Sequence, residues 1–361
     1  MPSASHTPLG HALRYTNECY DGMRDDIART SAYYKAIDAS TRANDIVLDI
    51  GTGKLALLAI RAAQAGAKEV YAIEVNAHVA EAARATIAAA GFADRITVLQ
   101  GFSTDPHLSL PSKATLVVHE LIGEVAGEEG AFHAIQDARR RFLEPHARSV
   151  PARSRTLIAP CEHPDETFCK SLPPGLFSDA AGQARALRLQ GLPRSCLLAP
   201  AVPFELLDFE ASTPEPRQKS QLYFQMTRAG RLFGLALHVD LTMMGDTSER
   251  NEISDATSAE EGVDISSAWE GSHWRNVLLT LDHHVDLEAG QRLRVDTSCE
   301  LGGPQPRYTF EAWFEDTSAA GDTHGDTPAA WHSLGPVLHF PEAALNCNDM
   351  MDLESERFGS D

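Results

Sequence analysis

The stretch Val-Leu-Asp-Ile-Gly-Thr-Gly (residues 47–53) decides the fold of the first half of the chain. An apolar run from Ile46 leads into the Gly-Thr-Gly turn, a helix rich in small residues follows from Ala56, and a second apolar run ends in Glu74. In this layout the glycines let a ligand approach the backbone, the helix N-terminus faces it, and the carboxylate binds two ribose hydroxyls. The sequence therefore predicts a site for an adenosine-containing cofactor.

Strand-like and helix-like segments alternate from Ile46 to about Thr156, which is typical of a mostly parallel sheet with helices on both faces. The expected strands cover 46–50, 69–74, 95–99 and 114–118, and the expected helices cover 54–65, 77–90 and 130–142. Upstream, residues 17–38 read as helical, and Met23, Asp26 and Arg29 then fall three apart, roughly on one face.

After Pro151 the pattern changes to short β-branched or aromatic runs separated by Pro, Gly, Ser and Asp, which predicts an antiparallel sheet or barrel. The fold class is therefore α/β, followed by an antiparallel β domain. The expected parts are an N-terminal helical segment, the α/β domain, the β domain and a tail, over residues 1–44, 45–157, 158–345 and 346–361. Residues 163–198 resemble neither half and are expected to form an inserted arm.

Composition narrows the possible partners. The chain has 361 residues, enough for two domains, and a net charge of −20, which argues against a nucleic-acid groove. This charge suits a cationic substrate such as a basic peptide or a guanidinium compound, or it serves solubility alone.

No apolar run reaches the ~18 residues needed to span a membrane. The six cysteines contain no CxxC pair, so neither a metal nor a disulfide is expected, and a cytoplasmic location follows.

A second group of residues narrows the choice of cofactor, because the glycine turn alone suits both NAD and S-adenosylmethionine. Val117 to Phe132 follows the fourth strand and carries Glu120 and Glu129, with three glycines that let the chain fold back. Much later comes Ser272-His273-Trp274.

These motifs, in this order over about residues 15–315, resemble those of the protein arginine methyltransferases. The loop with Glu120 and Glu129 resembles the family's double-glutamate loop, residues 272–274 its Thr-His-Trp loop, and the Met23 segment its amino-terminal helix. Three further segments look most like the monomethylating, type III branch: Tyr33 to Ile37, Tyr71 to Val75 and Ser149 to Arg153. The resemblance implies a Rossmann-like domain that binds S-adenosylmethionine, then an antiparallel β-barrel, with an arm that often makes a homodimer.

The resemblance also implies roles for individual residues. Arg29 would pair with the cofactor's carboxylate, Gly51 and Gly53 would pass beneath its methionine part, and Glu74 would bind the ribose. Ser103 and Thr104 fall where the family contacts adenine, Met23 belongs to the amino-terminal helix of the site, and Tyr20 would line the cofactor cleft or simply pack.

For the reaction, Glu120 and Glu129 would grip the planar guanidinium and aim one nitrogen, and His273 with Asp26 would relay its proton. Two carboxylates suit this task because arginine's fork has fixed N–H donors and stays protonated.

The chain departs from the family at three places: Lys54-Leu55 lengthens the glycine loop by one residue, His119 stands where the family has Ser or Thr, and Glu124 and Glu128 add two acids.

We therefore expect an S-adenosylmethionine-dependent N-methyltransferase acting on arginine in a protein or peptide. One alternative is methylation of free arginine or a guanidino metabolite in biosynthesis. A second is a catalytically weak scaffold that keeps the fold. A third is a methyltransferase for another nitrogen or oxygen, such as one in RNA, against which the acidic charge argues.

Overall fold

The computed structural model describes residues 17–173, 176–177, 185–245, 263–316, 330–334 and 338–340. The expected tail over 346–361 lies outside these ranges, as do parts of the expected arm over 163–198.

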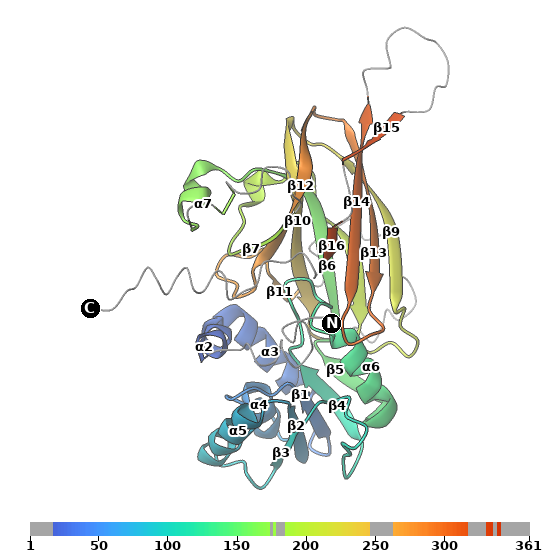
Figure 1. The fold of residues 1–361 in the computed structure, drawn as a ribbon. Coiled ribbons are helices and arrows are strands. Elements are labelled where there is room, and N and C mark those ends of the chain that lie inside the picture. Colours follow the sequence, from blue (N-terminus) through green and yellow to red (C-terminus); the bar gives the residue numbers. More distant parts are fainter. Residues whose placement is uncertain are drawn as a thin grey trace, which may run out of the picture.

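The first half contains a five-stranded sheet in the order β3-β2-β1-β4-β5, in which every neighbouring pair is parallel. The strands are β1 (Ile46–Ile50), β2 (Glu69–Glu74), β3 (Ile96–Gln100), β4 (Ala114–His119) and β5 (Leu143–Val150). The helices that follow β1, β2 and the fourth strand are α4 (Leu57–Gln64), α5 (Ala77–Ala89) and α6 (Ala131–Arg141); α4 and α5 cover one face and α6 the other (Figure 1). The predicted alternation is confirmed. The strand order reverses between β1 and β4, and ligands of such sheets bind at the carboxyl ends of the strands there.

The N-terminal segment is helical over 17–38, as expected, and forms two helices, α2 (Asn17–Asp25) and α3 (Ile27–Ser40). Asp26 separates them and is the N-cap of α3, where its side chain accepts a hydrogen bond of 2.9 Å from the backbone N–H of Arg29. Aspartate favours this position because its carboxylate satisfies an N–H that has no partner within the helix.

The glycine loop continues for three residues before α4, which begins at Leu57 and not at residue 54 as expected. Lys54, Leu55 and Ala56 form a turn closed by a 3.2 Å hydrogen bond from Ala56 N–H to the carbonyl of Gly53. Ala56 has φ +45° and is the one non-glycine residue with positive φ among those the structure describes. This turn places a non-glycine residue in a strained left-handed conformation, at the point where the resemblance predicts a loop longer by one residue.

The second half is antiparallel, as predicted, and its strands form two sheets. One has the order β7-β12-β10-β6-β8, with β11 beside β10, and the other has the order β15-β14-β13-β9, with β16 beside β14. The first comprises β6 (Arg153–Glu162), β7 (Ala186–Leu189), β8 (Val202–Asp208), β10 (Gly230–Thr242), β11 (Ile265–Ser266) and β12 (Asn276–Leu287). The second comprises β9 (Arg217–Gln225), β13 (Arg292–Glu300), β14 (Arg307–Asp316), β15 (Ala330–Ser333) and β16 (Leu338–Phe340). The short α7 (Glu166–Lys170) and the 3₁₀ turn η3 (Arg194–Cys196) lie within the expected arm.

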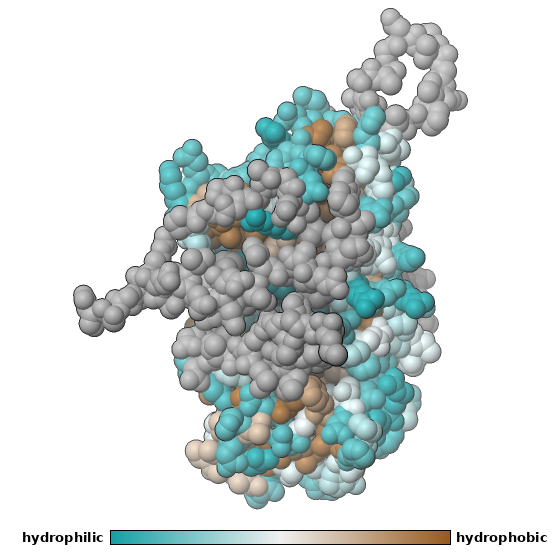
Figure 2. All heavy atoms as spheres, in the orientation of Figure 1, coloured by the Kyte–Doolittle hydropathy of each residue, from teal (hydrophilic) through white to brown (hydrophobic). Residues whose placement is uncertain are grey.

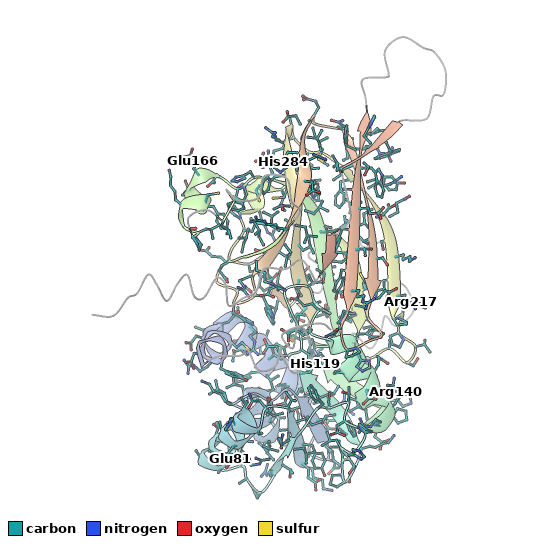
Figure 3. The ribbon with its side chains drawn as sticks, in the orientation of Figure 1. Glu81, His119, Arg140, Glu166, Arg217 and His284 are labelled. Carbon is teal, nitrogen blue, oxygen red and sulfur yellow. The ribbon has the colours of Figure 1, made fainter. Side chains whose placement is uncertain are left out.

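One hydrophobic core runs through both halves and includes Val47 of β1, Leu235 of β10 and Leu293 of β13. His119, at the end of β4, lies where the halves meet (Figure 3). Where residues are described, the face in Figure 2 is largely hydrophilic, which fits the acidic composition. No helix within the described ranges is long and apolar enough to cross a membrane.

Candidate active site

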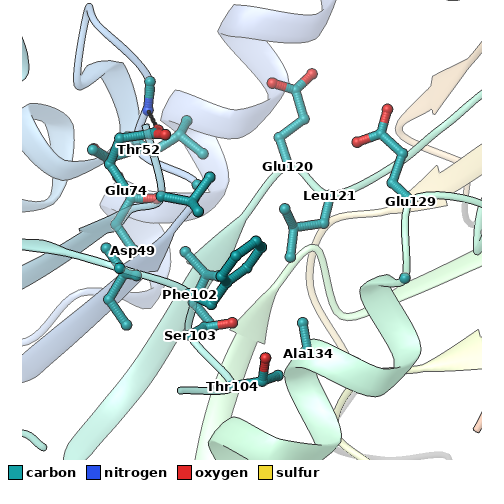
Figure 4. A pocket seen from close by; sticks show the side chains of 18 of the residues that line it. Asp49, Thr52, Glu74, Phe102, Ser103, Thr104, Glu120, Leu121, Glu129 and Ala134 are labelled. Atoms are coloured by element: carbon teal, nitrogen blue, oxygen red, sulfur yellow. Dashed lines mark hydrogen bonds between the residues drawn. The ribbon is translucent and has the colours of Figure 1, made fainter. Parts of the chain in front are cut away.

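A cavity lies at the carboxyl ends of β1, β2, β3 and β4, the place expected from the strand order (Figure 4). All eight residues expected to bind the cofactor line it: Tyr20, Met23, Arg29, Gly51, Gly53, Glu74, Ser103 and Thr104. Both acids expected to hold the substrate, Glu120 and Glu129, line it too. The fold thus brings residues that are far apart in the sequence together in one hollow.

Glycine is required at two positions of the cavity wall. Gly51 has φ +78°, and a Cβ there would lie 3.1 Å from the side chain of Leu121. Gly53 has φ +63°, and a Cβ there would lie 2.8 Å from the ring of Tyr20. Because positive φ disfavours other residues and both contacts are tight, side chains at these positions would push against other residues of the cavity wall.

Glu74 is 6% exposed and braces the glycine loop from β2. Its carboxylate accepts hydrogen bonds from the N–H groups of Gly53 at 3.1 Å and Asn76 at 2.9 Å. Burial raises the pKa of Glu74 above its usual value. A carboxylate has about four acceptor sites, so these two bonds leave capacity to accept hydrogen bonds from ligand hydroxyls.

Asp49 is a cavity residue that the sequence interpretation missed. It is 1% exposed near the end of β1, and its Oδ2 has no hydrogen-bond partner among the described residues. Burial, with the charge of Glu74 nearby, raises the pKa of Asp49 to about 7. An acid inside the otherwise apolar run 46–50 was the signal in the sequence, because burying a carboxylate on a strand costs free energy unless a partner compensates for it.

The segment after β3 forms another wall and supplies Phe102, Ser103 and Thr104. Arg141 of α6 fixes this segment by donating to the backbone carbonyls of Ser103, Asp105 and Leu108, at 3.1, 2.6 and 2.6 Å. Phe102 was also missed, although an aromatic ring beside two hydroxyl residues offers a flat apolar face to a base.

Glu120 and Glu129 approach the cavity from the two ends of one loop, which we call the acid loop (residues 120–130). Glu120 directly follows β4. Glu129 lies before α6 and is separated from it by Gly130. Their side chains extend side by side in the same direction (Figure 4). Arg29, whose side chain is 3% exposed, forms an ion pair with Glu120. The structure thus places Glu120, the buried Arg29 and Glu129 around the same cavity.

His273 and Asp26 are not among the residues that line the cavity; they contact each other directly, and His273 lies next to Glu120. Asp26 Oδ2 lies 2.9 Å from both the backbone N and the ring Nδ1 of His273, and His273 Nε2 lies 3.5 Å from Glu120 Oε1. Burial would raise the pKa of Asp26, but hydrogen bonds from His273 and from the Arg29 N–H outweigh it and lower the pKa to about 2. Burial lowers the pKa of His273 below its usual value, although Asp26 opposes this. An ionised aspartate therefore orients a histidine that is neutral near pH 7.

The two additional acids, Glu124 and Glu128, do not line the cavity and form a charge cluster with two arginines. Arg275 donates to Glu124 at 2.9 and 3.0 Å, Arg188 donates to Glu128 at 2.7 and 2.9 Å, and Arg188 also pairs with Glu124. Burial would raise the pKa of Glu124, but the charges of Arg188 and Arg275 lower it below its usual value. Arg188 and Arg275 were missed because they come from β7 and from the segment before β12, and no sequence pattern joins those segments to this loop.

The family model and the sequence relatives that match this chain are all described as methyltransferases. Residues 28–126 match the family described as ribosomal protein L11 methyltransferase (PrmA). The chain is 29% identical over 302 residues to "Probable histone-arginine methyltransferase 1.3" of Arabidopsis thaliana, covering 75% of this chain and 51% of that protein. It is 29% identical over 294 residues to "Arginine N(omega)-methyltransferase" of Streptomyces achromogenes subsp. streptozoticus, covering 78% and 76%.

Among solved structures, a Trypanosoma brucei PRMT1 enzyme-prozyme heterotetrameric complex with AdoHcy matches with a TM-score of 0.65 and 19% identity, covering 87% of this chain and 96% of that chain. This likeness shows the fold. The chain spans about half the length of the Arabidopsis relative.

Proposed function

We propose that this chain, whose sequence relatives are arginine methyltransferases, uses S-adenosylmethionine to methylate a guanidino nitrogen of arginine. The observation that carries the proposal is the joint placement of Glu120, Glu129 and Arg29 in the cavity that also holds the glycine loop and Glu74.

The cavity residues fit S-adenosylmethionine in their chemistry. Glu74 has acceptor capacity for the ribose hydroxyls, and Gly51 and Gly53 keep the wall below the methionine part free of side chains. Arg29 is the cation for the cofactor's carboxylate, and residues 102–104 suit the adenine. The T. brucei complex was solved with AdoHcy, the product of such a transfer. When bound, the cofactor supplies a methyl group on a sulfonium, which is already an excellent leaving group.

Because the leaving group needs little help, the task of the protein is to place the nucleophile. Glu120 and Glu129 accept hydrogen bonds from the guanidinium fork and hold one terminal nitrogen toward the methyl position. Their negative charges also draw positive charge away from that nitrogen. Arg29 contacts Glu120 directly, so it orients this acid as well as the cofactor.

The proton released by the guanidinium leaves through Glu120 and His273. Asp26 accepts the Nδ1 hydrogen of His273, which leaves Nε2, on the side of Glu120, as the basic nitrogen. The lowered pKa of His273 keeps this nitrogen unprotonated near pH 7, so it can receive the proton.

The substrate we propose is an arginine within a protein or peptide, as the name of the Arabidopsis relative suggests. Free arginine is the second candidate, favoured by the S. achromogenes relative, which matches about three quarters of both chains. The type III likeness makes monomethylarginine the expected product.

The test is transfer of a deuterated methyl group from S-adenosylmethionine to free arginine and to an arginine-glycine peptide, read by mass spectrometry, with cofactor binding measured by calorimetry. We expect one methyl group on the peptide and a clearly slower reaction with free arginine. The opposite preference would make free arginine the substrate. Cofactor binding without transfer to either would favour the scaffold alternative, and no binding at millimolar cofactor would remove the proposal.

We further propose that the chain is a cytoplasmic homodimer, on the family resemblance and the absence of closely spaced cysteine pairs in the sequence. Sedimentation that gives only a monomer at micromolar concentration would contradict the dimer.

A further inference from the structure

Three consecutive residues directly before Glu129 are held by side chains of the antiparallel half. The backbone N–H of Ala126 donates to Thr156 Oγ1 of β6 at 2.9 Å, and that of Gly127 donates to Glu205 Oε2 of β8 at 3.4 Å. The carboxylate of Glu128 is held by Arg188 of β7. The position of Glu129 is therefore determined from outside the parallel sheet.

Glu205 is the centre of this contact. It is 0% exposed, and besides Gly127 it accepts hydrogen bonds from the hydroxyls of Thr156 and of Tyr308, the latter at 2.7 Å. Thr156 and Tyr308 are also fully buried. A carboxylate buried among three donors is fixed in place, because any other orientation would leave a buried polar group without a partner.

The loop is packed tightly onto this carboxylate. A Cβ on Gly127 would lie 2.5 Å from Glu205 Oε1 and 2.7 Å from the Tyr308 hydroxyl. The backbone of the acid loop thus approaches the network as closely as a glycine allows. The space between them admits no shift of the loop toward β8, and the hydrogen bonds resist a shift away from it.

We propose that Glu205 and Thr156 are positioning residues for Glu129, which set the place of the second guanidine-binding acid through the backbone of Ala126 and Gly127. This inference rests on the proposed function for its effect on turnover. Neither side chain is among the residues that line the cavity, so both act through the loop.

The chain contains a matched control at the opposite end of the parallel sheet. Thr115 of β4 donates through its hydroxyl to the buried carboxylate of Asp45 at 2.7 Å, and Arg148 holds the same carboxylate at 2.7 and 2.8 Å. Asp45 directly precedes β1 and is therefore at the amino end of this strand, whereas the cavity is at the carboxyl end. Like Thr156→Val, Thr115→Val removes a hydroxyl that donates to a buried carboxylate, but it does so far from Glu129 and leaves the bond to the Ala126 N–H in place.

The experiment compares Thr156→Val, Thr156→Ser, Glu205→Gln and Thr115→Val with the wild type. For each we would measure kcat and KM for the arginine substrate, the cofactor Kd by calorimetry, the unfolding midpoint, and hydrogen exchange of the amides over 124–130. We expect Thr156→Val and Glu205→Gln to lower kcat by one to two orders of magnitude, since a misplacement of ~1 Å can cost about 10²-fold. Their cofactor Kd should change less than about twofold, and the amides of Ala126 and Gly127 should exchange faster.

Thr156→Ser keeps the hydroxyl and should restore most of the lost kcat, whereas Thr115→Val should lower the unfolding midpoint with kcat unchanged. The inference is overturned if Thr156→Val keeps the wild-type kcat, or if kcat falls only together with cofactor affinity or equally in Thr115→Val. Absence of any transfer by the wild type would instead refute the proposed function. Hydrogen exchange then decides the loop contact alone: faster exchange in Glu205→Gln supports it, and unchanged exchange overturns it.

Discussion

The acid loop carries two pairs of glutamates that differ in their position relative to the cavity. Glu120 and Glu129 line the cavity, and Glu124 and Glu128 face two arginines of the antiparallel half. Glu128 also turns back on its own loop, accepting hydrogen bonds from the N–H of Glu124 at 2.7 Å and of Val125 at 3.3 Å.

The comparison shows that glutamates close together in the sequence have different surroundings, and we therefore expect them to have different roles. The inner pair, Glu124 and Glu128, is neutralised within the chain and gives the loop its shape. The outer pair, Glu120 and Glu129, lines the cavity, where Glu120 also pairs with Arg29, so its carboxylates lie within reach of a ligand. If this division is right, the same chemical change should affect turnover at one pair and stability at the other.

The largest effect is expected from Glu129→Gln. The amide is neutral and cannot balance the guanidinium, so we expect turnover to fall on the order of 10³-fold. Cofactor affinity should stay within about twofold by calorimetry, and Glu120→Gln should likewise abolish turnover while the cofactor still binds. Near wild-type turnover in either variant would refute the two-acid grip.

Glu128→Gln, one residue earlier, should mainly reduce stability. Arg188 would lose one of its two acids in a largely buried setting, and breaking a buried pair costs about 3 kcal/mol. Urea denaturation followed by circular dichroism measures this. A stability equal to that of the wild type, together with lost turnover, would reverse the roles of the pairs.

His119, directly before Glu120, should make stability depend on pH. Its ring is 0% exposed, and burial, with the nearby charge of Arg139, lowers the pKa of His119 to about 3. The unfolded chain takes up a proton below about pH 6.5, so the contribution is complete above that pH and is lost as pH falls toward 3. Between pH 7 and 5 the wild type should lose about 2 kcal/mol more than His119→Leu. Parallel urea midpoints of the two proteins over this range would contradict a neutral buried ring.

The smallest effect is expected from Glu81→Ala on the outer surface of α5 (Figure 3). Its pair with Arg84 spans 3.0 Å, but the side chains are 77% and 44% exposed. Exposed pairs contribute little, so unfolding should change by less than about 0.5 kcal/mol. This variant gives the baseline for loss of an acid, and a change as large as that of Glu128→Gln would mean that urea denaturation does not distinguish a buried ion pair from an exposed one.

The sequence predicted the parts of the site that local patterns encode. Residues 46–50 and 69–74 follow the strand rules closely, so β1 and β2 have the expected bounds and Gly51, Gly53 and Glu74 lie at one cavity. The break at Asp26 was missed because helical spacing does not reveal a cap within a longer polar run. The strained turn at Ala56 was missed because alanine favours a helix and its φ is imposed by the neighbouring packing.

Contacts made through tertiary structure could not be predicted. Thr156 and Glu205 are ordinary polar residues on β strands, and only the folded chain brings them to the acid loop. Cys161 and Cys196 show the same limit: their spacing of 35 suggested no pairing, yet their sulfurs lie 3.2 Å apart in the core. Pairings between distant strands depend on register, which spacing along one chain does not encode.

The anchoring of the acid loop from β6, β7 and β8 has a consequence for how such a protein can be rebuilt. A fragment ending at Val150 would carry both outer glutamates and every predicted cofactor residue, yet none of the side chains that fix Ala126, Gly127 and Glu128. The two halves are therefore not interchangeable modules. On the proposed function, an engineer who grafts a new antiparallel half onto this parallel sheet would have to transplant an acceptor hydroxyl, a buried acid and a paired arginine together, because these groups hold the loop that carries Glu129.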